Sequence, residues 1–331
     1  MSHFSLSNNH GGGRTIFVCF PDEGDDLFFV PTCRRDDLAK PYIGIRKAIE
    51  KAGFKFKTTT DGSGLSDVAA ILSITHISTP FLQNILKHSN SKCFLVIQEP
   101  PVFRPEVYNP HLKRFFRTMF TMFDNLVDNR TYFKFYHFQA RDKMVENIPG
   151  FADKKFSVML QSHLKSPYPN ELYSERDKVA QFFANSDEFD LYGRLWEGTP
   201  NWRGYFNEDK ITLIKDYKFC FCFENMKNQV GYITERIFEV MFSGSVPIYW
   251  GADNITDYVP KDCFIDRRDF SSYDDLYRFL NSIDQTRYEA YLTAIQNYLH
   301  SPQFEPFSSP DRFGKHIVDT MVSILQHQAH F

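Results

Sequence analysis

Short apolar runs of strand length alternate with segments of helical periodicity along most of the chain, and this alternation constrains the fold more than any other feature of the sequence. In the first half, TIFVCF (15–20), AAILSI (69–74) and KCFLVIQEP (92–100) are typical of buried strands, and segments 40–53 and 78–87 are typical of helices. A strand–helix repeat of this kind predicts a mainly parallel sheet with helices on both faces.

The same alternation returns after about residue 165. Strands are expected at 187–193, 217–225, 246–251 and 263–266, and helices at 234–243 and 272–283. The turn-rich segment SPYPNE (166–171) separates the two halves. We therefore predict an α/β fold class with two Rossmann-like domains, 15–165 and 166–331, that face each other across a cleft. Residues 1–14 are predicted to be a disordered leader.

Composition excludes several classes of function. The formal net charge of −3 gives no field for a polyanion, so no nucleic-acid partner is expected. The longest apolar runs have strand length, far short of the roughly 18–20 residues of a membrane span. The N-terminus lacks a cationic segment followed by an apolar one, as a secretory signal requires. These features predict a cytoplasmic protein of bacterial type with no evident membrane association, or else a piece of a membrane-tethered protein. The six cysteines are predicted to be buried free thiols.

The segment YKFCFCFENMKNQVGYITERIFEVMFSGSVPIYWG (217–251) carries the densest functional signal. It predicts a buried strand, a polar loop, a helix and a second buried strand. Glu224 and Asn225 follow the first strand and should emerge at the cleft. Thr234 is a natural N-cap, which places Glu235 and Arg236 in the first helical turn, where a phosphate is favoured.

Arg236 is unusual because a cation in the first helical turn is unfavourable unless an anion compensates it. The anion is a bound phosphate on one interpretation; on the other, Arg236 is exposed or pairs with Glu239. Glu235 is a candidate ribose ligand, or else an acidic residue that only stabilises the positive end of the helix dipole. Tyr232 either stacks on a base or is an ordinary loop tyrosine.

This segment resembles the signature of the α-1,3/α-1,4-fucosyltransferase family, glycosyltransferase family 10. The signature runs Tyr-Lys-Phe, Phe-Glu-Asn, Tyr-(Ile/Val)-Thr-Glu-Lys, a hydrophobic helix and Val-Pro-(Ile/Val)-Tyr-Trp-Gly. It continues here through Pro260, Phe264, Ile265, Asp269 and Phe270. The match over 217–270 is close to continuous, and it extends weakly to FDLYGR (189–194) and QEPPVFRPE (98–106).

The resemblance implies the GT-B arrangement, with an N-terminal acceptor domain and a C-terminal donor domain that binds GDP-β-L-fucose. It implies that Arg194 and Arg236 clamp the diphosphate and that Asn225, Tyr232 and Glu235 hold donor groups. The family commonly has Lys where this chain has Arg236, so the charge is kept while the planar guanidinium changes the contact geometry.

Glu99 follows a predicted strand and precedes Pro100-Pro101, so it is either a general base at the cleft or an exposed loop residue. The resemblance favours the base, because family members carry a glutamate in a similar element. His76 and His137 are the alternatives. Segment 111–128 predicts an amphipathic helix and a buried strand, or else a basic acceptor-binding rim that includes Arg104, Lys113 and Arg114.

The implied reaction is an inverting, single displacement in glycan biosynthesis. Glu99 deprotonates a hydroxyl of an oligosaccharide or glycoconjugate acceptor, which takes L-fucose in an α-1,3 or α-1,4 linkage. Two alternatives keep the fold: an enzyme that uses another nucleotide-sugar donor, and a non-catalytic protein that binds a sugar nucleotide or glycan. A Rossmann dehydrogenase is disfavoured, because Gly62-Ser-Gly64 lacks the third glycine of the fingerprint and follows no clear strand.

The sequence contains no Asp-x-Asp, the usual divalent-metal element of other glycosyltransferases, so no metal cofactor is expected. Two arginines and a helix N-terminus supply the charge that a metal would otherwise provide. We expect transfer activity to survive excess EDTA. A loss of activity that Mn²⁺ or Mg²⁺ restores would contradict this prediction.

Overall fold

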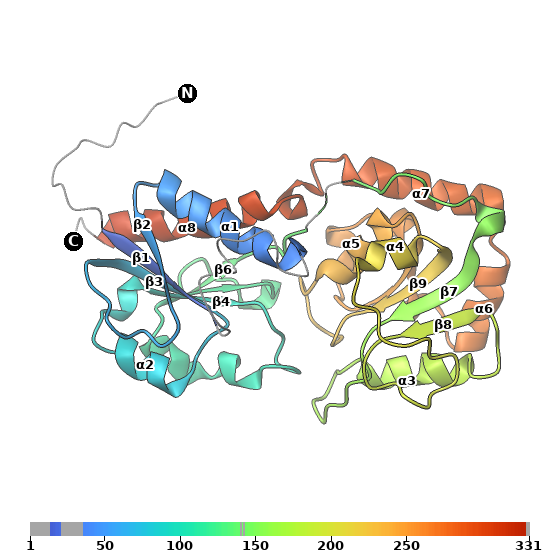
Figure 1. The fold of residues 1–331 in the computed structure, drawn as a ribbon, viewed down its shortest axis with the longest axis horizontal. Coiled ribbons are helices and arrows are strands. Elements are labelled where there is room, and N and C mark those ends of the chain that lie inside the picture. Colours follow the sequence, from blue (N-terminus) through green and yellow to red (C-terminus); the bar gives the residue numbers. More distant parts are fainter. Residues whose placement is uncertain (1–13, 21–35, 140, 142, 329–331) are drawn as a thin grey trace.

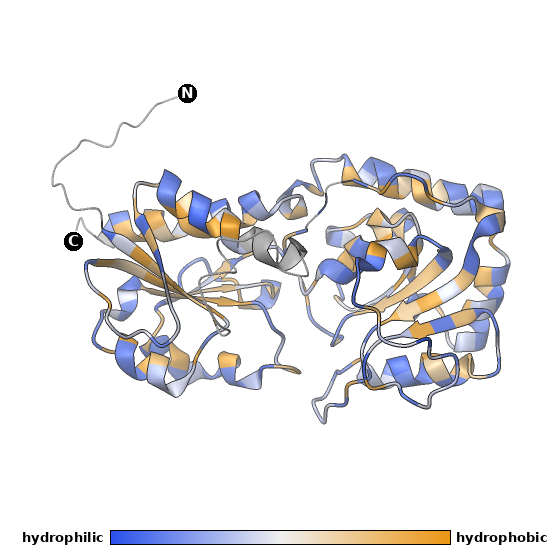
Figure 2. Cartoon of the chain, viewed as in Figure 1, coloured by the Kyte–Doolittle hydropathy of each residue, from blue (hydrophilic) through white to orange (hydrophobic). Residues whose placement is uncertain are grey.

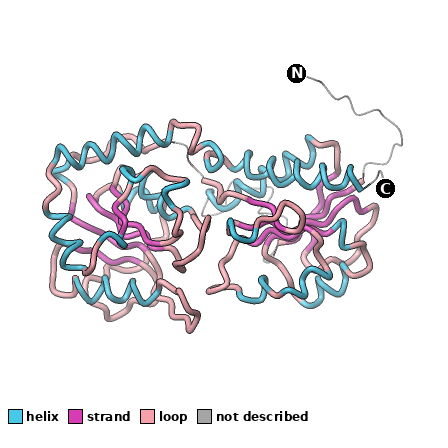
Figure 3. Tube along the Cα trace, turned by 180° about the vertical axis from the view of Figure 1, so that it is seen from behind, coloured by secondary structure: helices cyan, strands magenta, loops and turns pink. Residues whose placement is uncertain are grey.

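The computed structural model describes residues 14–20, 36–139, 141 and 143–328, and they form two parallel sheets. The first sheet has the strand order β2-β1-β3-β4-β5-β6 and the second the order β11-β10-β9-β7-β8. Figures 1 and 3 show the sheets side by side, each flanked by helices. The predicted α/β class with two Rossmann-like units is confirmed. Residues 1–13 of the predicted leader (1–14) and Cys33 lie outside the described residues.

The strands of the first sheet are β1 (Thr15–Cys19), β2 (Lys55–Thr59), β3 (Val68–Ile74), β4 (Cys93–Ile97), β5 (Thr118–Thr121) and β6 (Tyr132–Lys134). Those of the second are β7 (Lys155–Leu160), β8 (Phe189–Tyr192), β9 (Tyr217–Phe223), β10 (Val246–Trp250) and β11 (Ile265–Asp266). The helices are α1 (Asp36–Lys51), α2 (Thr79–Ile85), α3 (Tyr173–Phe182), α4 (Lys210–Ile214), α5 (Glu235–Phe242), α6 (Tyr273–Asn281), α7 (Gln285–Leu299) and α8 (Pro310–Gln328).

The central strands are apolar on both faces because helices and loops cover both sides of each sheet. In the first sheet, alternate residues such as Leu72 and Val96 pack toward α1 and α8, while Ile71 and Leu95 pack toward α2. Figure 2 shows the apolar strands of the second sheet, which separate two further buried clusters. The five described cysteines are buried and free, as predicted.

Segment 111–128 differs from the prediction. A 3-10 helix, Pro110–Arg114, replaces the expected amphipathic helix, and the buried strand is β5. Pro110 begins this helix and the side chain of Asn109 caps it.

The chain passes from the first sheet to the second between β6 and β7. Strand β7 therefore lies in the second sheet although it precedes residue 165, and α8 returns to pack against α1 (Figure 1). As a domain boundary, 165/166 stays a prediction. None of the helices that the structure describes has the length and apolar character needed to cross a bilayer.

Asp124, directly after β5, ties the first sheet to the second. Its backbone N–H donates to the carbonyl oxygen of Val230 over 3.0 Å. Its carboxylate accepts hydrogen bonds from Tyr258 at 2.7 Å, Asn254 at 2.9 Å and Lys134 at 2.6 Å. These contacts set the relative position of the two sheets on one side of the cleft.

Two glycines allow α1 and α8 to cross closely. A Cβ atom on Gly314 would lie 2.3 Å from the carbonyl carbon of Gly44, and a Cβ atom on Gly44 would lie 2.4 Å from the carbonyl oxygen of Pro310. Backbone atoms cannot rotate away as a side chain can, so a larger residue has to push the helices apart.

We expect Gly314→Ala to lower the free energy of unfolding by about 1–3 kcal/mol, the usual cost of overpacking, despite the better helix propensity of alanine. Urea unfolding measures the effect. Gly150→Ala is the control, because its Cβ atom would meet only the flexible side chain of Asp153 at 3.3 Å. Equal stability of the two variants would contradict the close crossing.

Candidate active site

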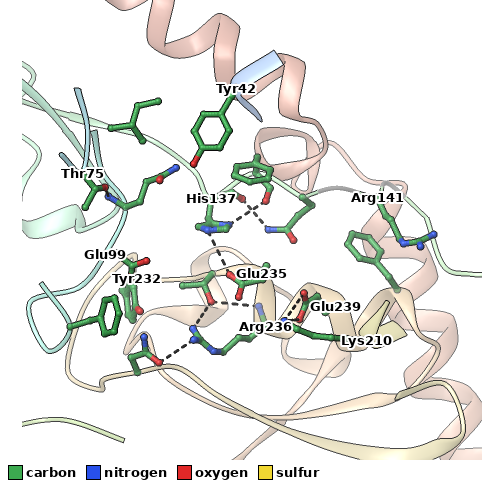
Figure 4. Close-up of a pocket in the computed structure, with 18 of the residues that line it drawn as sticks. Tyr42, Thr75, Glu99, His137, Arg141, Lys210, Tyr232, Glu235, Arg236 and Glu239 are labelled. Carbon is green, nitrogen blue, oxygen red and sulfur yellow. Dashed lines mark hydrogen bonds and ion pairs between the residues drawn. The ribbon is translucent and has the colours of Figure 1, made fainter. Parts of the chain in front are cut away.

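A pocket of about 420 Å³ lies between the two sheets (Figure 4). From the first sheet it is lined by Thr75 after β3 and Glu99 after β4, and from the second by Asn225 after β9 and by the first turn of α5. The carboxyl ends of parallel strands are where open α/β sheets bind ligands. A second pocket of about 320 Å³ shares several of these residues and extends toward the ends of β7 and β8.

The first turn of α5 is built as the sequence predicts. Thr234 is the N-cap, and its hydroxyl oxygen accepts from the backbone N–H of Arg236. The carboxylate of Glu224 accepts hydrogen bonds from the backbone N–H and from the hydroxyl of Thr234, each with a length of 2.8 Å. The backbone N–H of Glu224 is bonded to Trp250 on β10, so the helix begins at a fixed point of the sheet.

Arg236 forms an ion pair with Glu224, with 2.9 Å between Nη1 and Oε2. The Glu224 side chain is fully buried, and that of Arg236 is 22% exposed. Burial disfavours the charged guanidinium and by itself would lower the pKa of Arg236. The negative charges of Glu235 and Glu224 outweigh burial, so the pKa of Arg236 is raised. The compensating anion within the protein is therefore Glu224; Glu239 instead pairs with Lys210, at 2.9 Å.

The side-chain oxygen of Asn225 accepts two hydrogen bonds from guanidinium groups. Nη2 of Arg236 and Nη2 of Arg176 each lie 3.0 Å from it. Two donors on one amide oxygen fix the orientation of the amide.

Glu235 faces His137, with 3.6 Å between its Oε2 and the Nε2 of the imidazole (Figure 4). Burial opposes ionisation of this carboxyl group, but Arg236, His137 and Lys210 outweigh it and lower the pKa of Glu235 to about 2. Glu235 is therefore an anion at neutral pH, and it lies in the pocket beside His137, which follows the last strand of the first sheet.

Glu99 lies on the opposite side of the pocket from α5. Its backbone oxygen accepts from the hydroxyl of Tyr108 at 2.9 Å, and no described residue forms a hydrogen bond to its carboxylate. Burial raises the pKa of Glu99; Arg236 and Arg104 oppose this rise and Glu235 adds to it. A partly buried carboxylate with a raised pKa and no fixed partner has the properties of a general base.

Tyr232 and Arg194 differ from the other predicted site residues in their surroundings. The ring of Tyr232 is 1% exposed and stacks on Phe123 of the first sheet at 5.5 Å, so one of its faces is already covered. Arg194 is exposed and lines neither pocket. Its guanidinium lies over the ring of Tyr205 and donates to the hydroxyl of that residue at 3.1 Å.

Of the other candidates, Arg104 lines the pocket, whereas Lys113 and Arg114 do not. His137, which follows β6, lines it as well. Arg176 was not identified from the sequence: a single arginine among polar helix residues is typical of a solvated face, yet it is 2% exposed. Among the residues with described positions, no group of three or more His, Cys, Asp or Glu side chains is arranged to hold a metal ion.

Comparison with solved structures defines the class of fold. The structure of an α1,3-fucosyltransferase with GDP-fucose superposes with a TM-score of 0.57 at 16% identity, over 98% of this chain and 94% of that one. The architecture is that of GT-B glycosyltransferases.

Residues 153–308 match the C-terminal domain model of glycosyltransferase family 10 (fucosyltransferase), so this part of the chain is a domain of that family. It is 37% identical over 129 residues to the alpha-(1,3)-fucosyltransferase FucT of Helicobacter pylori, which is 38% of this chain and 26% of that protein. It is 39% identical over 80 residues to an alpha-(1,4)-fucosyltransferase of Arabidopsis thaliana, 24% of this chain and 20% of the relative. The matches thus span about a quarter of these relatives or less.

The buried imidazole of His137 makes the stability depend on pH. Burial lowers the pKa of His137. Glu235 opposes this effect, and Arg236 and Lys210 add to it. Below the unperturbed pKa of about 6.5, the unfolded chain binds a proton that the folded protein resists, so stability falls as the pH falls.

We expect His137→Gln to lose less stability than the wild type when the pH is lowered from 7.5 to 5.5, measured by urea unfolding at each pH. His300→Gln is the control, since His300 is exposed at the end of α7. If wild type and His137→Gln lost the same amount, protonation of His137 would carry no cost in the folded state.

Proposed function

We propose that this protein is an inverting fucosyltransferase that transfers L-fucose from GDP-β-L-fucose to a hydroxyl group of a glycan. The near-continuous family signature at 217–270 carries the proposal, because its polar residues Asn225, Glu235 and Arg236 meet in one pocket opposite Glu99. The α1,3-fucosyltransferase of the same fold contains GDP-fucose, and the curated relatives are named for α-1,3 and α-1,4 transfer.

In the proposed reaction, Glu99 removes the proton of the acceptor hydroxyl as its oxygen attacks the anomeric carbon. The bond to the diphosphate breaks, GDP leaves, and the configuration at that carbon inverts. The raised pKa of Glu99 favours this role, because a base is most effective when its pKa approaches the working pH.

The second sheet holds the donor. Arg236 and the N-terminus of α5 stabilise the negative charge that develops on the leaving diphosphate. Asn225 donates to the same group, and the Glu235 carboxylate accepts from hydroxyl groups of the donor. Tyr232 contacts the donor through its hydroxyl and not by stacking on the base, because Phe123 covers one face of its ring. Arg194 reaches the diphosphate only after it leaves Tyr205. This set of charges requires no metal ion in the proposed mechanism.

Binding and transfer together test the function. A nucleotide at 100 times its dissociation constant stabilises a protein by about 2.7 kcal/mol, so GDP is expected to raise the melting temperature while UDP and CDP have little effect. Transfer assays with GDP-fucose, GDP-mannose and UDP-glucose then identify the donor. Equal stabilisation by UDP, or transfer from UDP-glucose alone, would contradict GDP-fucose as the donor and indicate another nucleotide sugar. Binding without transfer to any acceptor of a glycan panel would favour the non-catalytic alternative.

Substitution of the proposed base separates chemistry from donor binding. Glu99→Gln keeps the shape of the side chain and removes its proton affinity, so we expect kcat to fall by about 10²–10⁴ while GDP affinity is unchanged. The wild-type rate falls on the acid side as Glu99 protonates, and the variant loses this dependence. Glu106→Gln serves as the control, because Glu106 is an exposed glutamate in the nearby 3-10 helix Pro105–Tyr108. A fully active Glu99→Gln enzyme would assign the base to another group, with His137 the next to test.

A further inference from the structure

Arg176 is a buried cation without a carboxylate partner among the described residues. It lies on α3 and is 2% exposed. Its guanidinium donates hydrogen bonds of 3.2–3.3 Å to the backbone carbonyl oxygens of Ser162, Phe223 and Glu224. The fourth acceptor is the amide oxygen of Asn225 at 3.0 Å. All four acceptors are neutral, and its Nε has no hydrogen-bond partner.

This environment distinguishes Arg176 from the other two cations of the second pocket. Arg236 is paired with Glu224 and Lys210 with Glu239, both at 2.9 Å. No described carboxylate lies within 4.0 Å of Arg176, as an ion pair requires. Burial lowers the pKa of its guanidinium to about 9, which still leaves it charged at neutral pH. A buried charge without a counter-ion is costly, and a bound anion removes that cost.

Asn225 transmits the effect of Arg176 to the cavity. Its amide oxygen is held by Arg176 and Arg236, so its Nδ2 is turned away from both guanidinium groups. This nitrogen donates to no described residue, and Asn225 lines both pockets. The start of α3 is tied to the same residue, since the backbone N–H of its N-cap residue Leu172 donates to the backbone oxygen of Asn225 at 3.0 Å.

We propose that Arg176 is a positioning residue for the diphosphate of the donor: it aims the Asn225 amide N–H₂ at the phosphate oxygens and supplies positive charge that the diphosphate compensates. This inference rests on the proposed function for the identity of the donor, but its chemistry concerns the diphosphate alone. Inorganic pyrophosphate is therefore a probe that does not depend on the base or the sugar.

The first test is Asn225→Asp, which places a carboxylate against both guanidinium groups and provides the missing counter-ion without a change of size. We expect a melting temperature at or above that of the wild type and a loss of pyrophosphate and GDP affinity of roughly 10–100-fold, with guanosine affinity unchanged. A variant that is less stable than the wild type, or that binds pyrophosphate normally, would overturn the proposal.

The second test removes the charge and the planar group separately. Arg176→Met is expected to weaken pyrophosphate binding at least tenfold, whereas Arg176→Lys keeps the charge and recovers part of the affinity. For Arg176→Lys, the KM for the donor should rise more than kcat falls. Lys178→Met is the control, because it removes an exposed positive charge from the same helix.

The outcomes also separate this inference from the proposed function. If wild type binds pyrophosphate and all nucleoside diphosphates alike, the GDP-fucose donor is wrong while Arg176 keeps its role. If Arg176→Met folds and binds pyrophosphate as the wild type does, the role of Arg176 is wrong while the donor is unaffected. A wild type that binds neither pyrophosphate nor any nucleoside diphosphate contradicts both.

Discussion

The buried ion pair between Glu224 and Arg236 fixes the geometry on which the pocket depends. The Glu224 carboxylate has no exposure to solvent, yet it accepts from both donors of the Thr234 cap as well as from Arg236. The Glu224 side chain therefore links the end of β9 to the start of α5, so a displacement of either element breaks these hydrogen bonds. Removal of one partner from such a pair typically costs about 3–5 kcal/mol, because a buried charge is left behind. The orientation of Asn225 depends on the same guanidinium.

The pocket also requires the two sheets to keep their positions, and two kinds of contact do this. Tyr232 of the second half stacks on Phe123 of the first and belongs to the core that α1 and α8 cover. Beside it, Asp124 binds Tyr258 and Asn254 across the junction. An apolar contact of this kind resists separation, while short polar contacts fix the angle of approach. The pocket between Glu99 and α5 is therefore an element of the fold and not a gap between independent units.

Sequence patterns predicted the parts of the fold that depend on local order. Central strands such as β4 and β10 are continuous apolar runs, and the Thr234 cap marks the start of α5 by its chemistry. Strand β2 was missed because it lies at a sheet edge and its sequence, KFKTT, is half-exposed. The return of α8 to α1 was missed because no local pattern specifies a partner so distant in the chain. Arg176 was missed because its importance comes from backbone carbonyls of other segments.

The distribution of charge in the pocket follows from these contacts and bears on the base. Burial raises the pKa of Glu99, and Arg236 is the group that opposes this rise most. The Glu224 carboxylate beside Arg236 offsets part of the charge of that guanidinium. On the proposed function, a bound diphosphate adds negative charge beside Arg236 and offsets more of that charge. The carboxylate of Glu99 is then a stronger base with the donor in place than without it. On the proposed function, the pairing of Arg236 with Glu224 therefore has two effects: it fixes the guanidinium beside the leaving group, and it limits how far that guanidinium lowers the pKa of Glu99.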